Sequence, residues 1–519
     1  MKNIIELSGA DITIILIYLV LLIAVAIWAS YGKRNRSGNM FLADKSLGWF
    51  AIGLTMWGTN VGPSMLIANA SSGYENGITA GNFSWYAFPF ICLLAFVFAP
   101  RYLAANVTTL PEYMGKRFGA DTRKYIAWYS IITILVSWLG LTLFSGGIFM
   151  AQILDYPLWL CIVILVSVSA SFAIAGGLKA IAYTNVYQML LLIGVSILLA
   201  VMAIVKVGGV GTVIEKTPPH YWNLFQPLSD PDFPWLAILL GYPIMGVWFW
   251  CTDQSMVQSV LGAKNLKQGQ MGANFCAWLK IIDIPLFIVP GILCFLLIPT
   301  LSNPTDSYLQ LVQSVFPSGL TGLVVVIMAA ALISTIGAAL NSLSAVYTMD
   351  IYLKNNPGKS AAESVKKTGR IVVLFGALIS VFLAIGITFI QGLSFFNIFQ
   401  SVLGFLAPPM ASAFLFAVFG KRTSPKAINL TLTAGTIFSL GTGVLYYAGY
   451  IFRSLHFLYL SFLIFIVLAA FIFVVSLTDK AGKRSESDYK PAIVNKKVKI
   501  AWIVLIVIMF ALYFIFNGH

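Results

Sequence analysis

The stretch MWGTNVGPS, residues 56–64, lies inside an apolar segment that begins near Leu47 and continues from Met65. It contains glycine, proline and asparagine, which weaken or end helices. Such an interruption releases backbone carbonyls from the i→i−4 ladder, and an unsatisfied carbonyl in hydrocarbon costs several kcal/mol. A dehydrated Na⁺ ion would satisfy these oxygens. The stretch therefore predicts an ion or solute site at mid-membrane, and the alternative is a proline kink that serves only packing.

The composition predicts a membrane protein. Of the 519 residues, 59% are hydrophobic and only 10% are charged, against about 25% charged in a typical soluble domain. Apolar runs of roughly 20 residues, the length that crosses a bilayer as a helix, recur along the whole chain. The runs are continuous and do not alternate, which excludes a β-barrel. The predicted fold class is an all-α polytopic membrane protein.

Fourteen candidate spans are predicted. They cover roughly residues 12–30, 48–70, 80–101, 125–152, 157–176, 181–205, 236–261, 271–298, 319–352, 370–391, 394–419, 426–447, 455–477 and 498–516. An even number of crossings puts both termini on one side. Of the 32 Lys and Arg residues, 27 fall in alternate loops, which places those loops in the cytoplasm and both termini outside it. The net charge of +14 is then explained by loops that face anionic lipid in the cell membrane, and not by a nucleic-acid surface.

Two interrupted spans predict internal symmetry. The second span is broken by MWGTNVGPS, and the seventh contains GYPIMG at residues 241–246. Paired Gly/Pro interruptions in two halves indicate a transporter with inverted repeats. The predicted parts are a peripheral helix and cytoplasmic loop (1–47), a first five-helix repeat (48–205), an extracellular loop (206–235), a second repeat (236–420) and C-terminal peripheral helices (421–519).

Other functional classes lack their motifs. The five cysteines all lie in apolar runs without the paired spacing of zinc or redox sites. No GxxxxGK[ST] phosphate loop is present, so an ATP-driven pump would lack its motor on this chain. The protein is therefore predicted not to be an enzyme.

Adjacent hydroxyls in the ninth span would complete an ion site. Ser334 and Thr335 lie in MAAALISTIGAALNS, residues 328–342, where small residues allow close approach between membrane helices. Together they predict an oxygen-rich patch. The alternative is that each hydroxyl bonds back to the carbonyl four residues earlier.

Three charged residues fall within predicted spans: Asp253, Lys280 and Asp283. Each costs about 2.5–3.5 kcal/mol at mid-helix on insertion scales, so each indicates a functional site. Lys280 and Asp283 are three residues apart and can meet on one helix face, and Asp253 on the preceding span could compete for the same ammonium. The alternative is a neutralised structural pair without a role in transport.

Polar and aromatic groups accompany these charges at membrane depth. Gln254, Gln258 and Gln400 supply hydrogen-bonding groups, and Trp248–Trp250 supplies flat aromatic faces. Aromatic walls with a few placed polar groups suit a small polar ligand such as a sugar. Interface or core packing is the alternative for the aromatic residues.

Several segments resemble sodium/solute symporters, and specifically the sodium/glucose cotransporter group. They are SLGWFAIGLTMWGTNVGPS, TTLPEYMGKRFG, WFWCTDQSMVQSVLGAKN, ISTIGAALNSLSAVYTMDIY and FLAPPMASAFLFAVFGKR, in order over about residues 40–425. The resemblance implies a LeuT-like core of two inverted five-helix repeats with added peripheral helices.

The resemblance also implies which residues bind Na⁺. The main sodium site falls on the carbonyls of Gly58, Val61 and Ala331 and the hydroxyls of Ser334 and Thr335. The aspartate of the family's second sodium site is replaced by Asn185 in TNVYQ, and its hydroxyls by Gly337 and Ala338. One Na⁺ per solute is therefore expected.

The sugar site implied by the resemblance is partly kept. Asn60, Trp250, Lys280 and Gln400 match the family's sugar-binding residue types. Phe249, Met65 and Ser84 replace, respectively, the outer-gate tyrosine, a histidine or glutamine, and a glutamate that contacts sugar hydroxyls. Asp253 and Gln254 are added to the candidate solute site as neighbouring polar groups, and Asp283 lies outside the family pattern.

The predicted function is sodium-coupled import of a small polar solute, with a sugar or polyol as first choice. Na⁺, the solute and the lipid bilayer are the predicted partners. A non-sugar solute such as a carboxylate, vitamin or amino-acid-like compound is the nearest alternative, because Lys280 could hold a carboxylate. A channel or a solute sensor is the more distant one. Neither the oligomeric state nor the identity of the solute follows from the sequence.

Overall fold

The computed structural model describes residues 8–31, 41–317, 319–356, 362–387, 395–452, 454–479 and 495–517. Within these ranges the regular structure is helical, and strand pairing is limited to two isolated bridges. One bridge joins Leu47 to Ala263 and thereby holds the start of the second predicted span against the end of the seventh. The all-α fold class is confirmed.

The first half of the chain forms helices α1 to α11. They are α1 (Gly9–Tyr31), α2 (Trp49–Asn60), α3 (Pro63–Asn76), α4 (Gly81–Trp85), α5 (Phe88–Leu93), α6 (Ala99–Ala104), α7 (Leu110–Phe118), α8 (Ala120–Thr133), α9 (Leu141–Leu154), α10 (Leu158–Val207) and α11 (Val210–Lys216). The π-helical segments η3 (Leu94–Phe98) and η4 (Ile134–Gly140) continue α5 and α8.

The second half forms helices α12 to α24. They are α12 (Trp235–Gly246), α13 (Gln254–Leu261), α14 (Leu266–Ile281), α15 (Val289–Leu297), α16 (Ser307–Val315), α17 (Leu320–Val346), α18 (Leu353–Asn355), α19 (Ala362–Ile387), α20 (Phe395–Phe419), α21 (Pro425–Leu430), α22 (Thr436–Tyr447), α23 (Phe457–Thr478) and α24 (Lys496–Ile515). Three π-helical segments matter below: η6 (Val247–Thr252), η7 (Ile284–Ile288) and η9 (Tyr347–Tyr352).

Ten helices within the described ranges are long and apolar enough to cross a membrane, and eleven if the bent pair Leu266–Ile281 and Ile284–Leu297 counts as one span. Two shorter apolar helices, Gly9–Tyr18 and Leu158–Ile174, add to these. The multi-span membrane architecture is confirmed, and the number fourteen stays a prediction.

Helix α10 covers two of the predicted spans and doubles back on itself. Gln152, just before it, donates to Asp306 at 3.2 Å, and Lys206, near its end, donates to the Ser314 carbonyl. The chain therefore enters and leaves α10 beside the same segment, 306–314. A straight helix of 50 residues would instead separate its ends by about 75 Å.

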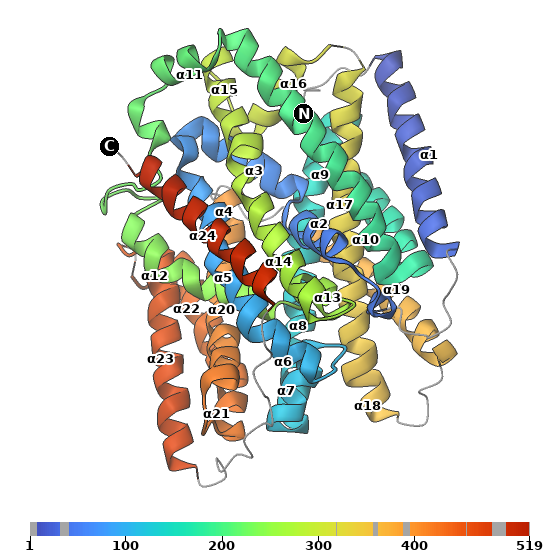
Figure 1. Ribbon diagram of the computed structural model, residues 1–519, viewed down its shortest axis with the longest axis vertical. Coiled ribbons are helices and arrows are strands. Elements are labelled where there is room, and N and C mark those ends of the chain that lie inside the picture. The colour runs from blue at the N-terminus through green and yellow to red at the C-terminus, as the bar shows by residue number, and fades with distance from the viewer. Residues whose placement is uncertain are drawn as a thin grey trace.

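The first and the last described segments of the chain, near Asp11 and Phe516, lie toward the same face. Near its start, α1 docks on α17, because the Asp11 carboxylate accepts the Gly319 and Gly322 N–H groups at 2.7 and 2.6 Å. At the other end, Leu224 donates to the Phe516 carbonyl at 2.9 Å. Figure 1 shows α11 and α16 at this end of the molecule, and α7, α18 and α21, which adjoin basic loops, at the opposite end. This arrangement agrees with an even number of crossings.

The predicted break in the second span is confirmed. Helix α2 ends at Asn60 and α3 begins at Pro63, with Val61 and Gly62 between them. Pro63 is at the first helical position of α3, where its missing N–H costs nothing. The chain is therefore unwound at the centre of the MWGTNVGPS stretch.

The predicted break in the seventh span is in the wrong place. Helix α12 runs unbroken through Gly241, Pro243 and Gly246, and the chain leaves the helical conformation at Asp253 (φ −80°, ψ 129°). Pro243 has no N–H to donate to the Leu239 carbonyl, but the Tyr86 hydroxyl donates to that carbonyl at 3.4 Å. At Asp253 the carboxylate caps the new helix by accepting two backbone N–H groups of α13.

Helices around the break pack through glycine. A Cβ at Gly291 of α15 would come within 1.9 Å of the Ala70 carbonyl, and one at Gly73 of α3 within 2.1 Å of the Ile288 carbonyl. The two backbones are therefore in direct contact, which is the role of small residues between membrane helices. This contact holds α3 firmly beyond the break.

Candidate functional site

The unwound residues between α2 and α3 leave main-chain oxygens without their helical donors. Val61 departs from helical geometry at ψ 76°, and Gly62 donates to the Asn60 carbonyl at 3.1 Å rather than to that of Gly58. Met65 donates to the Gly62 carbonyl at 2.9 Å rather than to that of Val61. The carbonyls of Gly58 and Val61, two of the predicted sodium ligands, are thus freed from the ladder.

Two buried hydroxyls of α17 lie beside this break. Ser334 and Thr335 are both buried, and within the described part of the chain neither hydroxyl has a hydrogen-bond partner. A Cβ built on Gly62 would lie 3.6 Å from the Thr335 Oγ1 atom, so this hydroxyl faces the unwound residues. The alternative of back-bonding to the preceding turn is therefore not realised. Ala331, the remaining predicted ligand, is buried one turn earlier on α17.

Lys280 connects the broken helix to the candidate solute site. Its Nζ donates to Asn60 Oδ1 at 2.7 Å, lies 3.5 Å from Ser84 Oγ, and forms a buried ion pair with Asp283. It also lies 5.8 Å from the centre of the Trp250 ring, within reach of a cation–π interaction. The Lys280 ammonium is therefore the point at which these four side chains, all noted in the sequence, come together.

A pocket opens beside Lys280. Its empty volume is about 450 Å³, open solvent included, and small-molecule sites usually span about 300–1,000 Å³. Predominantly aromatic and apolar side chains surround two polar ones. The lining residues are Asn60, Met65, Phe83, Tyr242, Met245, Trp248, Phe249, Trp250, Lys280 and Leu403.

Aromatic rings form one wall of this pocket. Phe249 stacks on Trp138 of η4 with ring centres 5.4 Å apart, and its edge meets Trp250 at 5.1 Å. Tyr242 donates its hydroxyl to the Phe83 carbonyl at 2.6 Å. The predicted positions Met65, Phe249 and Trp250 are therefore brought together with Asn60 and Lys280.

Two predicted solute-site residues belong elsewhere. The Asp253 carboxylate accepts Ser255 and Met256 N–H groups and the Trp138 indole N–H at 3.1 Å, so it caps α13 and does not compete for Lys280. The Gln254 side chain accepts the Leu110 N–H at 2.9 Å. Neither residue lines the pocket. The side chain of Gln400 lies outside the described residues.

Several contributing residues were not predicted. Trp57 of α2 donates its indole N–H to Asp283 at 2.8 Å, and Trp138, Phe83 and Tyr242 help to build the pocket wall. Trp57 adjoins the broken stretch, which is a signal that could have identified it. Trp138 is 111 positions from Phe249 and has no comparable signal.

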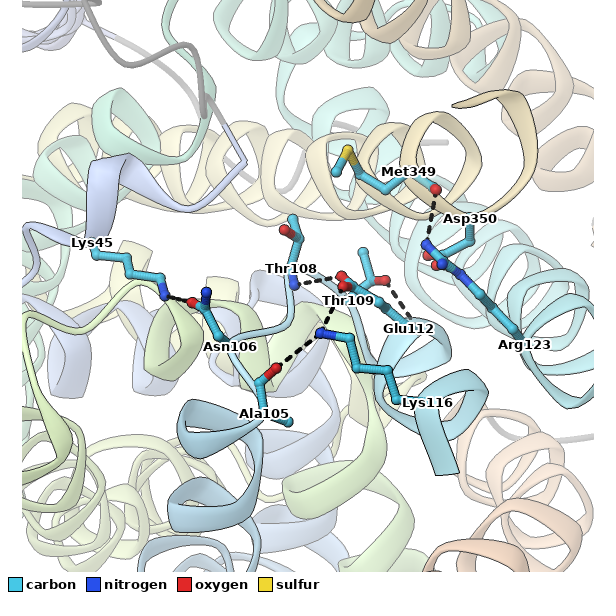
Figure 2. A network of polar contacts seen from close by, with 10 residues as sticks. All are labelled: Lys45, Ala105, Asn106, Thr108, Thr109, Glu112, Lys116, Arg123, Met349 and Asp350. Atoms are coloured by element: carbon cyan, nitrogen blue, oxygen red, sulfur yellow. Dashed lines mark hydrogen bonds and ion pairs between the residues drawn. The ribbon is translucent and has the colours of Figure 1, made fainter. Parts of the chain in front are cut away.

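A second polar network lies at the end of the molecule that carries the basic loops. Figure 2 shows Arg123 of α8 directed at Asp350 of η9, with an Nε–Oδ1 distance of 2.7 Å and a further bond to the Met349 carbonyl at 3.0 Å. Next to it, Lys116 and Glu112 pair on α7 at 3.3 Å. This network joins the start of α8 to the end of the long α17 helix.

The described fold and site can be compared with known proteins. The chain is 31% identical over 526 residues to sodium/glucose cotransporter 1 of Ovis aries, covering 91% of this chain and 79% of that protein. It is 32% identical over 479 residues to sodium/glucose cotransporter 4 of Homo sapiens, covering 85% and 69%. These relatives are transporters.

Solved structures support the fold alone, because their identity is low. A Na⁺-coupled sialic acid symporter in a substrate-bound outward-open state superposes with a TM-score of 0.78 at 18% identity, covering 92% of this chain and 99% of that one. A nucleobase-cation-symport-1 family transporter in a closed conformation gives 0.52 at 16% identity, covering 84% and 92%. The LeuT-like helical architecture is therefore confirmed.

The model of one protein family matches most of the chain, over residues 40–428. That range contains both helix breaks, the hydroxyl pair on α17 and the pocket. Together with the identities above, it establishes that this chain belongs to the sodium:solute symporter family.

Proposed function

We propose that the protein imports a small uncharged polar solute, a hexose or a polyol, together with one Na⁺ ion bound between α2 and α17. The observation that carries this proposal is the pair of unpartnered buried hydroxyls, Ser334 and Thr335, beside the unwound residues of the broken helix. Buried polar groups usually have a partner; other described side chains also lack one, but this pair lies beside carbonyls freed from the helical ladder and therefore calls for an explanation. A cation that takes oxygen ligands supplies one.

The proposed ion site uses five oxygens. Gly58 and Val61 supply carbonyls that have lost their helical donors, Ala331 supplies a carbonyl with a spare lone pair, and Ser334 and Thr335 supply hydroxyls. Na⁺ bound there ties α2 to α17. Since Asn60 and Trp57 are on the same turn of α2 as Gly58, the ion also orders Asn60, which contacts Lys280, and Trp57, which contacts Asp283.

The residues at the family's second sodium site support a stoichiometry of one Na⁺ per solute. Asn185 replaces the aspartate there and supplies no charge. Gly337 and Ala338 stand where hydroxyls are expected, so two further ligands are missing. An ion at that position would be desolvated without compensation.

The solute pocket supports an uncharged hydroxylated compound. Flat rings at Phe249 and Trp250 offer apolar faces, and Asn60 and Lys280 offer hydrogen bonds. The relatives whose names include glucose point to the same class. A carboxylate solute is less well supported, because Lys280 is already paired with Asp283.

The proposed orientation puts both termini outside the cytoplasm. Helices α7, α18 and α21, which adjoin basic loops in the sequence, lie at the opposite end from α11 and α16 (Figure 1), and cytoplasmic loops carry the excess of Lys and Arg. The proposed repeats are residues 48–205 and 236–420, since each contains one broken helix near its start. Na⁺ entry then gains about 2.3 kcal/mol per 100 mV of inside-negative potential.

Uptake into proteoliposomes tests the proposal. With an imposed Na⁺ gradient, we expect one compound in a panel of sugars, polyols and organic acids to accumulate saturably with one Na⁺ per solute. Thr335→Ala should raise the Na⁺ concentration for half-maximal uptake about tenfold or more, because removing a ligand to a buried ion costs roughly 1.5–3 kcal/mol. Ser169→Ala, which removes a hydroxyl bonded to the Leu165 carbonyl, is the matched control.

Four results would contradict the proposal. Unchanged Na⁺ dependence in Thr335→Ala would remove the ligand assignment. A measured coupling of two Na⁺ per solute would remove the single-ion proposal. Solute flux without accumulation would indicate a channel, and binding without flux a sensor.

A further inference from the structure

Asp283 is a buried carboxylate that touches the solute site only through other side chains. It lies between α14 and η7, and both of its oxygens are used. One accepts the Trp57 indole N–H at 2.8 Å and the other accepts the Lys280 ammonium. Asp283 does not line the pocket, so any effect it has on a solute is transmitted by Lys280.

Lys280 is the only charged side chain among the described residues that line the pocket. A lysine ammonium has three N–H donors, and these are directed at Asp283, Asn60 and Ser84. Asn60 and Ser84 are neutral. Of these contacts, therefore, Asp283 alone balances the ammonium charge, and the pair presents no net charge to a solute.

This neutrality bears on which solutes the pocket accepts. A hydroxyl can exchange hydrogen bonds with Asn60 and Lys280 without changing the net charge of the site. A solute carboxylate would lose its hydration and meet a cation whose charge is already compensated, with the Asp283 carboxylate close behind it. Burying an anion without a free counter-charge is unfavourable. Repulsion between the solute carboxylate and the Asp283 carboxylate disfavours an anionic solute further.

The same pair also fixes where the ammonium lies. Trp57 and Asn60 are one turn apart on α2, and they contact Asp283 and Lys280 respectively. The Lys280 and Asp283 side chains are therefore held by two points on the broken helix. Lys280 cannot turn from Asp283 toward an anionic solute without breaking these contacts.

We propose that Asp283 is the residue that sets the charge selectivity of this pocket: by neutralising Lys280 it makes the site accept uncharged polyhydroxylated solutes and reject their carboxylated counterparts. This inference rests on the proposed function, since it concerns the same pocket. It makes Asp283 a positioning residue, which acts on the solute through Lys280.

Competition against sodium-driven uptake tests this role with matched pairs of solutes. The pairs are glucose with glucuronate, galactose with galacturonate, and sorbitol with gluconate, which differ at one carbon. We expect the wild type to favour the neutral member of the pair. Asp283→Asn keeps the shape and an acceptor for Trp57 but leaves Lys280 unbalanced, so the preference should fall about tenfold or more.

A double variant keeps the test decisive if Asp283→Asn folds poorly. Lys280→Gln combined with Asp283→Asn restores neutrality, and we expect both solutes to bind more weakly while the preference for the neutral one returns. Cys276→Ser, a buried neutral position one turn before Lys280 on α14, should leave the preference unchanged. A loss of packing alone would weaken both solutes equally.

The failure of this inference is distinguishable from failure of the proposed function. If Asp283→Asn accumulates the neutral solute with an unaltered preference, or if the wild type favours the carboxylate, the role of Asp283 is wrong while sodium coupling stands. If no solute accumulates on a Na⁺ gradient in the wild type, the proposed function itself is wrong.

Discussion

Two buried ion pairs in this protein use the same chemistry in different settings. Lys280 and Asp283 are three residues apart, at the bend between α14 and η7, with side chains only 2% and 1% exposed. Arg123 and Asp350 are joined across 227 positions of sequence, and the arginine side chain is 24% exposed while the carboxylate is fully buried. The first pair borders the pocket, and the second lies at the end of the molecule that carries the basic loops.

The two ion pairs therefore contribute differently to the protein. Two residues only three apart in sequence add little to the tertiary fold by pairing with each other. The burial of Lys280 and Asp283 beside a pocket therefore indicates a role in setting the charge that a solute meets. A pair that joins α8 to η9 ties together two helices that are far apart in the sequence. Burial decides the cost of breaking each, because water compensates a lost partner only where it can reach.

The largest effect is expected at the fully buried pair. Within the described residues, Lys280→Met leaves the Asp283 carboxylate with Trp57 as its only hydrogen-bond partner, and breaking a buried pair on one side costs about 3–5 kcal/mol. We expect thermal unfolding of the purified protein in detergent to show this loss. Lys280→Met with Asp283→Leu removes both charges and should recover most of the stability while solute binding stays lost. Equal stability of the single variant and the wild type would show that the pair is hydrated.

A smaller effect is expected at the second pair. Arg123→Met removes two bonds, to Asp350 and to the Met349 carbonyl, and hydrogen bonds to charged groups contribute roughly 1.5–3 kcal/mol. The unfolding temperature should therefore fall less than for Lys280→Met. Uptake rates should change because the contact between α8 and η9 is lost. The preference between neutral and carboxylated solutes should stay as in the wild type. A change in that preference would remove the division of roles between the two pairs.

The smallest effect is expected at the exposed pair on α7. Lys116 and Glu112 are 51% and 17% exposed, and helix pairs four residues apart contribute about 0.3–0.5 kcal/mol. Lys116→Ala also loses a bond to the Ala105 carbonyl (2.9 Å). The unfolding free energy in low salt should fall by about 1 kcal/mol or less, and high salt should shrink the difference. A loss as large as that of Arg123→Met would contradict the dependence on burial.

Local chemistry made part of the site predictable. Gly62 and Pro63 in adjacent positions identify the break between α2 and α3, since proline has no N–H and glycine is a weak helix former. Lys280 and Asp283 are three residues apart, which alone predicts their contact on a helix. These features depend on residues close together in sequence.

The second break shows where local rules mislead. GYPIMG suggested an interruption at Pro243, yet α12 continues because the Tyr86 hydroxyl reaches the carbonyl that the proline leaves without a donor. The true break at Asp253 has a local signal, an N-cap carboxylate before a short helix. In the sequence alone, Asp253 also fits an intramembrane charge near Lys280, because a capping role depends on where the following helix begins.

The sequence by itself determined the helical membrane fold and the broken second span, because apolar length and Gly/Pro interruptions are local properties, and its resemblance to a known family supplied the candidate ion and solute residues. Only the tertiary structure decided that Thr335 faces Gly62, that Trp57 and Asn60 hold the Lys280–Asp283 pair, and that Asp253 caps α13 instead. These contacts join helices far apart in the chain, and the packing of whole helices, which no local spacing encodes, brings them together.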